Sequence, residues 1–396
     1  MSTLAIIADL DLAGAHARDC ARAFALVARG QAHSRAELGA QLGLRSTTTS
    51  HVVGDLLARR LLVEGFGEKA GRGRPARLLV ANIRRVGATV LHIASQSLGG
   101  ALVDLAGDVI EQRSVPVAPG ADAGTMAAAM AALAGELRAA APRGMDHAGT
   151  AVSLSGLADL RRGLWLMSSR WPRMRGLDVA AALDGAGPVS IARNLDAELS
   201  ARVMQEPALH AGGSLLLHWG WGIGLAYAVD GRSFAPADGS FGEIGHWRFA
   251  GLSGRRCGCG NTACLETGAG LWALMPRLRR DWPDLAEDEA VLQAQLPDCD
   301  LLALPEIDAA ARLVARALGN VCRLFFPARV TVTGPMVANA RLWAHFDALF
   351  RAEGVMDGRA MPVLVADRAS QRYEIRGAAE PLLSRAVERV LVAPTA

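Results

Sequence analysis

Residues 242–266 read GEIGHWRFAGLSGRRCGCGNTACLE. This stretch places one imidazole, that of His246, ahead of three thiols, those of Cys257, Cys259 and Cys264. Glycines stand between the thiols and allow the tight backbone turns that bring the sulfurs together. One imidazole and three thiolates form a closed tetrahedral set suited to structural Zn²⁺. We predict that these four side chains bind zinc; three free thiols on a glycine-rich loop are the alternative.

The composition of the 396-residue chain agrees with a globular, cytoplasmic protein. Hydrophobic residues make up 51% and charged residues 20%, and such a chain buries enough apolar surface to exclude intrinsic disorder. Six cysteines are too few for a disulfide scaffold. The first residues lack the basic start of a secretory signal, and no apolar run reaches the ~18 residues of a membrane helix. We expect two or three domains, a cytoplasmic location and no membrane insertion.

Basic residues are concentrated near the N-terminus. Residues 18–82 hold eleven basic and five acidic side chains, a net charge of +6, whereas the whole chain carries +3. The apolar pattern predicts three helices and two strands, at residues 18–28, 34–43, 44–57, 61–64 and 77–80. Ser34 and Glu37 have the spacing of a helix capping box. This order is typical of a winged helix-turn-helix DNA-binding domain, which we assign to residues 1–82; a small helical protein-interaction domain is the alternative.

The second helix of a helix-turn-helix lies in the major groove of double-stranded DNA. We predict that DNA contacts come from Arg35, Arg45, Ser46, Thr47, His51, Arg72 and Arg74. The last two belong to the sequence Arg72-Gly73-Arg74-Pro75, which is similar to the core of AT-hook peptides, where arginine enters the narrow minor groove. An ordinary basic wing tip or linker is the alternative for this segment.

From residue 86 onward, the pattern changes to apolar strands separated by glycine-rich turns and by helices rich in alanine and leucine. Strands are expected at 88–94, 99–105 and 109–117, and a helix at 125–139. Residues 98–109 have the pattern of two antiparallel strands joined by a tight turn. Strands that alternate with helices predict an α/β domain.

The zinc-type motif also carries a resemblance to a known family. The stretches 243–246 and 257–266 resemble the paired signature E-x-G-H and C-x-C-G-x-x-G-C-x-E of the ROK family, named for repressors, open reading frames and kinases. Only Ala263, where the family has glycine, departs from the pattern. Together with the winged helix-turn-helix, the resemblance covers nearly the full chain and points to the sugar-responsive transcriptional regulators of the family.

The resemblance implies an α/β fold in which the winged helix-turn-helix is followed by a two-lobed, actin-like and sugar-kinase-like (ribonuclease H-like) domain. The implied limits are 83–396 for this domain, with about 83–193 and 376–396 in lobe I and about 194–375 in lobe II. The family pattern further implies sugar contacts from Asn194, Glu243, His246 and Glu266. A metal on one ring nitrogen of His246 would fix the other nitrogen as a partner for a ligand hydroxyl. Taken one at a time, surface or helix-capping roles are the alternative for these residues.

Three departures from the kinase pattern argue against phosphoryl transfer. A ROK kinase has an aspartate base directly after the asparagine, where this chain has Leu195. Asp196 lies one position further, and one helical position turns a side chain by about 100 degrees. The first phosphate loop, D-x-G-G-T, corresponds to HIASQ at 92–96, and the second, G-T-G-I-G, to GWGIG at 220–224. The aspartate, two glycines and a threonine hydroxyl are thus missing, so we expect no kinase activity.

We therefore expect a non-catalytic repressor of carbohydrate uptake or catabolism genes. Its expected partners are double-stranded operator DNA, a sugar or sugar derivative as effector, and further copies of itself in a homodimer or homotetramer. Structural Zn²⁺ is the expected cofactor. Two alternatives remain at this point: an ATP-dependent kinase for a hexose or N-acetylhexosamine, and a regulator controlled by a partner protein or a non-sugar ligand.

Overall fold

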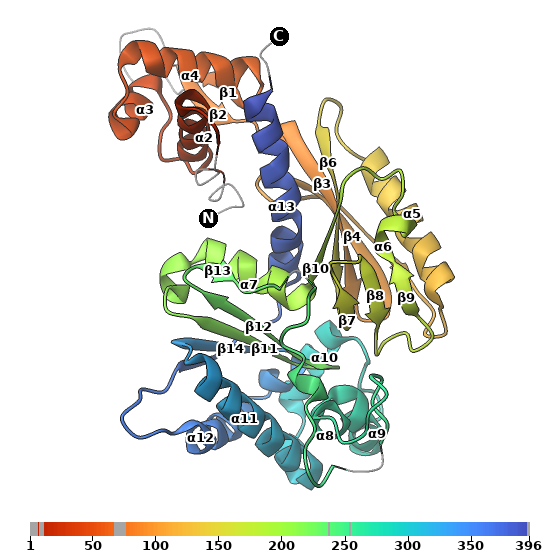
Figure 1. Cartoon of the computed structure of the whole chain (residues 1–396). Helices are drawn as coiled ribbons and strands as arrows, with labels where there is room; N and C mark the ends of the chain where they lie inside the picture. The colour runs from red at the N-terminus through yellow and green to blue at the C-terminus, as the bar shows by residue number, and fades with distance from the viewer. Residues whose placement is uncertain (1–6, 8–11, 67–76, 237, 253–254, 394–396) are drawn as a thin grey trace.

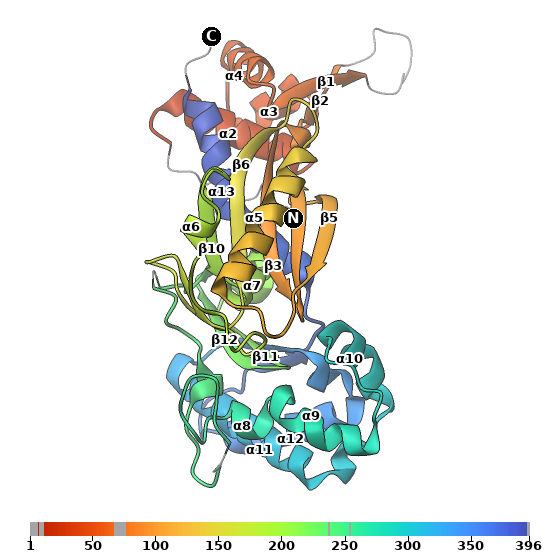
Figure 2. The same cartoon turned by 90° about the vertical axis from the view of Figure 1, so that its right-hand side faces the viewer.

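The computed structural model describes residues 7, 12–66, 77–236, 238–252 and 255–393. Figure 1 shows a small helical region at one end, a first sheet in the middle and a second sheet at the other end. The quarter-turn view in Figure 2 shows the same three-part order. The α/β fold class predicted from the sequence is confirmed. None of the helices in the described part of the chain combines the length and apolar character that crossing a bilayer requires.

The N-terminal region, which we call the head, contains the predicted order of elements. They are α2 (Ala15–Ala28), α3 (Arg35–Leu42), α4 (Ser46–Ala58) and the antiparallel strands β1 (Leu62–Phe66) and β2 (Arg77–Ala81). The Ser34 hydroxyl accepts a hydrogen bond from the Glu37 backbone N–H at 3.2 Å, which caps α3. Gly43 then ends that helix in the left-handed conformation, with φ of 67°. These local signals fixed the helix ends as the sequence predicted.

The first sheet has the strand order β10-β6-β3-β4-β5. Its strands are β3 (Val86–Ala94), β4 (Ser97–Asp104), β5 (Val109–Pro116), β6 (Asp146–Leu154) and β10 (Val189–Arg193). The predicted antiparallel pair at 98–109 is confirmed as part of β4 and β5, and β6 and β10 add in parallel to β3. Helix α5 (Ala123–Ala139) packs on one face, and α13 (Gln371–Val392) packs on the other (Figure 1). A small sheet and a short helix flank this region: β7 (Leu157–Asp159), β8 (Leu164–Met167), β9 (Arg175–Asp178) and α6 (Val179–Ala182).

The second sheet has the order β13-β12-β11-β14-β15. Its strands are β11 (Ser214–Trp219), β12 (Ile223–Val229), β13 (Arg232–Ser233), β14 (Arg329–Thr333) and β15 (Val363–Ala366). One face packs on α7 (Asn194–Gln205), and helices further along the chain pack on the other. These are α8 (Glu266–Ala269), α9 (Leu271–Asp281), α10 (Glu289–Gln295), α11 (Pro305–Phe325) and α12 (Ala340–Gly354). Short 3₁₀ helices lie at Ile83–Arg85, Pro207–His210, Ile244–His246, Leu296–Asp298, Leu301–Ala303 and Pro335–Ala338.

Helices α7 and α13 cross between the two sheets. Strand β10 of the first sheet ends at Arg193, and α7 begins at the next residue and packs on the second sheet. Helix α13 lies against α7, then follows the first sheet and reaches the head. A Cβ atom on Gly377 of α13 would lie 1.8 Å from the carbonyl oxygen of Ala197, so only glycine fits this crossing. Helix α13 runs unbroken across residue 376, where the predicted lobe II ends and lobe I resumes, so this one helix belongs to both predicted lobes. The domain and lobe limits given above remain predictions.

Glycine-to-alanine substitutions inside the crossing and away from it should have opposite effects on the stability of the protein. Gly377→Ala should destabilise the protein by at least about 1–3 kcal/mol, the usual penalty for forcing atoms into a packed contact. Gly135→Ala is the matched control, because Gly135 lies exposed in α5 with nothing within 4 Å of an added Cβ. There alanine should raise the stability by roughly 0.5–1 kcal/mol through its better helix propensity. Urea unfolding of both variants tests this, and a Gly377→Ala variant as stable as the wild type would contradict it.

Candidate functional site

A cleft of about 870 Å³ lies between the two sheets. Its walls come from residues after β3 and after β11, and its base from the first turns of α7 and α13. The four residues that the family pattern assigned to sugar binding all line this cleft, namely Asn194, Glu243, His246 and Glu266. The structure thus brings these residues together from separate segments. That they contact a sugar remains a prediction.

Glu243 is positioned by a close backbone contact. Gly242 has φ of 74°, and a Cβ there would lie 1.8 Å from the Leu225 carbonyl oxygen, so the chain passes directly against β12. The Glu243 carboxylate then lies 3.6 Å from the Arg193 guanidinium. Burial raises the pKa of Glu243, although Arg193 and His246 oppose the shift. The result is a carboxyl group held at the cleft wall beside a cation.

Glu266 is the first residue of α8 and is held by two donors. Its carboxylate accepts hydrogen bonds from the Ile223 backbone N–H at 2.9 Å and from the Trp272 indole N–H at 3.3 Å. These bonds fix the side chain on the cleft wall and leave acceptor capacity on the carboxylate for further partners. Such an oriented carboxylate is suited to accept hydrogen bonds from hydroxyl groups.

At the base of the cleft, Leu195 is a lining residue and Asp196 is not. Asp196 is only 5% exposed and lies 3.5 Å from the guanidinium of Arg193. Burial raises the pKa of Asp196 to about 6, against the opposing effect of Arg193. The side chains therefore lie as the shift of one position along α7 predicts. Of these two neighbouring residues, the one that lines the cleft, Leu195, cannot accept a proton.

The four predicted metal ligands converge beside the cleft. The Nδ1 atom of His246 lies 3.4 Å from the sulfur of Cys257, and the sulfurs of Cys259 and Cys264 are 3.6 Å apart. All four ligand atoms lie within 4.8 Å of one another. Ligand atoms around a tetrahedral zinc ion are separated by about 3.6–3.8 Å, given Zn–N and Zn–S bonds of about 2.0–2.3 Å. The donor set and its spacing therefore suit a metal ion.

His246 belongs to both parts of the site. Its Nδ1 atom faces the thiols, whereas its Nε2 atom lies 3.9 Å from a carboxylate oxygen of Glu243. The ligand loop carries one strained position, since Ala263 has φ of 63°, a left-handed conformation that glycine adopts without penalty. Ala263, which stands where the family pattern has glycine, is therefore held in a backbone conformation that glycine would adopt without strain.

The predicted DNA-contacting residues are placed differently from one another. Arg45, Ser46, Thr47 and His51 are exposed at the start of α4. Arg35 instead donates to the Glu64 carboxylate on β1 at 3.0 Å, so it is partly committed inside the head. Arg72 and Arg74 lie outside the described residues.

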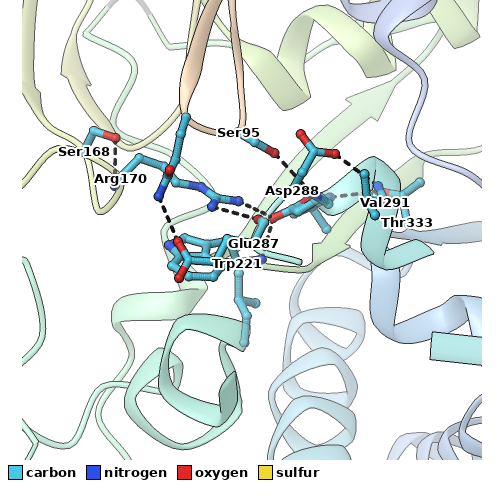
Figure 3. A network of polar contacts seen from close by, with 12 residues as sticks. Ser95, Ser168, Arg170, Trp221, Glu287, Asp288, Val291 and Thr333 are labelled. Atoms are coloured by element: carbon cyan, nitrogen blue, oxygen red, sulfur yellow. Dashed lines mark hydrogen bonds and ion pairs between the residues drawn. The ribbon is translucent and has the colours of Figure 1, made fainter. Parts of the chain in front are cut away.

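Sequence reasoning missed a polar network that crosses the cleft (Figure 3). Its centre is Glu289, the first residue of α10. The Glu289 carboxylate accepts a hydrogen bond from the Trp221 backbone N–H at 2.6 Å and lies 3.0 Å from His218 Nε2 and 3.4 Å from Arg170 Nη2. The Arg170 guanidinium also lies over the Trp221 ring, 4.0 Å from its centroid. Arg170 lies between β8 and β9, which flank the first sheet, and His218 lies on β11 of the second sheet, so the network joins the two sides of the cleft.

Residues after β3 complete the network from the other wall. The Ser95 hydroxyl accepts a hydrogen bond from the Glu289 backbone N–H at 3.1 Å, and the Gln96 amide donates to the Glu287 carboxylate at 2.8 Å. Ser95 and Gln96 belong to the stretch that corresponds to the first phosphate loop, and Trp221 to the stretch that corresponds to the second. Both stretches are therefore bonded to acidic residues of the chain itself. No motif marks Glu287 or Glu289, and we find no sequence signal that would have identified them.

The pair of His218 and Glu289 at the centre of this network predicts that the stability of the protein depends on pH. Burial alone would raise the pKa of Glu289, but His218 and Arg170 outweigh it and lower the pKa to about 2. Burial alone would lower the pKa of His218, but Glu289 and Glu198 outweigh it and raise the pKa above its usual value of 6.5. A raised histidine pKa stabilises the fold below pH 6.5, and this stabilisation is lost as the pH rises through the folded-state pKa.

Wild type should therefore exceed His218→Gln in stability by more at pH 6 than at pH 9. His210→Gln is the matched control with the opposite sign, because burial lowers the pKa of His210. The stability of the wild type relative to His210→Gln should therefore increase as the pH rises. Urea unfolding of the three proteins at both pH values measures these differences, and an equal difference at pH 6 and pH 9 for His218→Gln would contradict the charged pair.

Comparisons with known proteins agree with this architecture. The model of the ROK family matches residues 89–384. The xylose repressor of Bacillus subtilis (strain 168) is 23% identical over 273 residues, which cover 68% of this chain and 70% of the repressor. A crystal structure of a ROK family transcriptional regulator, described as a homolog of the E. coli MLC protein, superposes with a TM-score of 0.71 and 23% identity over 95% of this chain and 97% of its own.

A kinase structure shares the fold over a shorter part of the chain. The ROK family glucokinase of Streptomyces griseus, in complex with glucose and AMPPNP, superposes with a TM-score of 0.60 and 19% identity. It covers 74% of this chain and 98% of its own. At these identities the two solved structures show the fold alone. The predicted two-lobed, sugar-kinase-like fold is confirmed.

Proposed function

Because the chain belongs to the ROK family, we propose that it is a DNA-binding transcriptional regulator, a repressor of carbohydrate uptake or catabolism genes whose operator binding is controlled by a sugar. The observation that carries this proposal is the cleft lined by Asn194, Glu243, His246 and Glu266, in which Leu195 faces the ligand space in place of a base. The similarity to a xylose repressor and to a transcriptional regulator supports it.

We propose that residues 1–82 form the DNA-binding domain and residues 83–396 form the effector domain. The effector domain binds a ligand without phosphorylating it. Phosphoryl transfer needs an in-line base or positioning group and a phosphate cradle of backbone N–H groups. Leu195 cannot serve as the base, and the Trp221 N–H is bonded to the Glu289 carboxylate. The cleft thus retains polyol-binding chemistry without the phosphate-binding chemistry.

A structural Zn²⁺ ion is the proposed occupant of the cluster formed by His246, Cys257, Cys259 and Cys264. The ion would supply a fixed cross-link for a loop that has little regular structure of its own. His246 would contribute Nδ1 to the cluster and keep Nε2 on the cleft side, where Glu243 lies 3.9 Å away. The four ligands thereby set the ring orientation at the sugar site.

Coupling between the cleft and the head runs through α13. The first turn of α13 lines the cleft through Gln371 and Glu374. At the other end of the helix, the Arg59 guanidinium in the head donates hydrogen bonds to the carbonyl oxygens of Val390 and Ala393. A sugar that favours one arrangement of the lobes would shift α13 and with it the head. In a homodimer or homotetramer, such a shift changes the spacing of two heads relative to operator half-sites.

The effector is tested by thermal unfolding of the zinc-loaded protein with hexoses, pentoses, N-acetylated amino sugars and ATP. A sugar that binds should raise the melting temperature in proportion to RT ln(1 + [L]/Kd), and Glu243→Gln should abolish most of that rise. Asp357→Asn, at an exposed position outside the cleft, should respond like wild type. Stabilisation by ATP together with a phosphorylated sugar product would identify a kinase instead. No response to any sugar would move the effector to a partner protein or a non-sugar ligand.

DNA binding is tested on duplexes selected by the protein from a random-sequence pool. Arg45→Ala should weaken binding by about 1–3 kcal/mol if Arg45 contacts a base, or lower the salt slope by about one if it contacts a phosphate. Arg351→Ala removes an exposed arginine of α12 that pairs with Asp347, far from the head, and should leave the affinity unchanged. Equal losses in both variants would mean that general charge, and not the start of α4, governs binding.

A further inference from the structure

The head contains a second group of metal-ligating side chains, separate from the cleft. His16 and Cys20 lie one turn apart on α2, and His51 and Asp55 lie one turn apart on α4. Residues four positions apart share one face of a helix. The two pairs face each other where α2 packs against α4, since the His16 and His51 rings are 4.6 Å apart and His16 contacts Asp55.

Three of these side chains already have the spacing of ligands around one ion. His16 Nε2 lies 3.1 Å from Asp55 Oδ2 and 3.5 Å from the Cys20 sulfur, which lies 3.8 Å from Asp55 Oδ2. With the usual zinc bond lengths, a tetrahedral site separates nitrogen from oxygen by about 3.4 Å and sulfur from either by about 3.6 Å. Each distance differs from that expectation by about 0.1–0.3 Å. A histidine–aspartate ion pair alone would not require the thiol at this point.

The surroundings favour an occupied site. Asp55 uses its other oxygen, Oδ1, to accept a hydrogen bond from Arg59 at 2.8 Å, which orients the carboxylate and leaves Oδ2 toward His16 and Cys20. The His16 side chain is 41% exposed and that of Asp55 10% exposed, so an ion has a path from solvent to partly buried ligands. His51 is exposed beside His16 and supplies an imidazole on the open side.

We propose that His16, Cys20 and Asp55 bind a borderline divalent cation of the Zn²⁺ class, with His51 as the fourth ligand after a change of its side-chain rotamer. The mixed nitrogen, sulfur and oxygen donors select such an ion over Mg²⁺ or Ca²⁺, which take oxygen ligands. On binding, the Cys20 S–H bond is replaced by a sulfur–metal bond, and the proton is released to solvent. The ion would cross-link α2 to α4.

The metal content of the full-length protein tests the site. After saturation with Zn²⁺ and removal of the excess, wild type should hold two equivalents per chain, and His16→Gln should hold one fewer than wild type. Cys322→Ser, which removes a thiol buried in α11, is the matched control and should keep both. Cys259→Ser should also lose one equivalent, from the site near the cleft. Equal zinc content in His16→Gln and wild type would overturn the proposal.

Cobalt substitution provides a second readout that does not depend on counting ions. With Co²⁺ in both sites, the sulfur-to-cobalt charge-transfer band should arise from three thiolates near the cleft and one in the head. Its intensity should fall by about one thiolate's share in Cys20→Ser, and Cys322→Ser should retain the full band. If His51 is a ligand, His51→Gln should weaken Co²⁺ binding in the head by roughly 10–100-fold, the range found when metal-site interactions are removed. Unchanged affinity in His51→Gln would overturn its role as fourth ligand.

Metal binding would also withdraw His51 from the exposed surface of α4. This consequence rests on the proposed DNA-binding function. Zn²⁺ should then lower the DNA affinity of wild type but not of His16→Gln. The zinc and cobalt measurements need no DNA, so a missing DNA response with a confirmed metal count would count against the DNA role of His51, whereas a missing metal count would overturn the site itself.

Discussion

The close contact between α7 and α13 is the constraint on which the rest of the structure depends. Gly377 lets the two helices approach until the Ala197 carbonyl leaves no room for a side chain. Helix α7 packs on the second sheet and α13 on the first, so this one contact sets how the two lobes meet. The same helices supply the base of the cleft. Ligand space and lobe geometry are therefore determined by a single pair of rigid elements.

The features that the sequence predicts and the structure contains are those whose signal lies within a short segment. Ser34 and Gly43 mark the ends of α3 through local backbone rules, and the three cysteines at 257–264 converge because a short loop cannot place them far apart. The order of the elements in the head, and the elements β3, β4, β5 and α5 of the first sheet, follow from such local patterns. That Leu195 faces the cleft follows from the helical repeat of α7.

The cross-cleft network could not be predicted in this way, because its partners are brought together only by the tertiary fold. Glu289 contacts Trp221, His218 and Arg170, which lie 68, 71 and 119 positions away along the chain. An acidic residue in the first turn of a helix is common for reasons of the helix dipole alone, so Glu289 carries no signal of its partners. The head cluster is an intermediate case. Its two pairs at four-residue spacing are visible in the sequence, but the packing of α2 on α4 is needed to join them.

The hydrophobic core of the head is continuous with that of the first lobe. Phe24 and Leu56 of the head, Val90 of the first sheet and Leu382 and Val387 of α13 belong to one buried cluster. The head is therefore not a modular unit that could be exchanged between regulators at a linker. A chimera that joined another DNA-binding domain at residue 82 would expose apolar surface on α13 and on the first sheet. Transfer of DNA specificity to or from this protein would have to carry the matching surface of α13 along with the head.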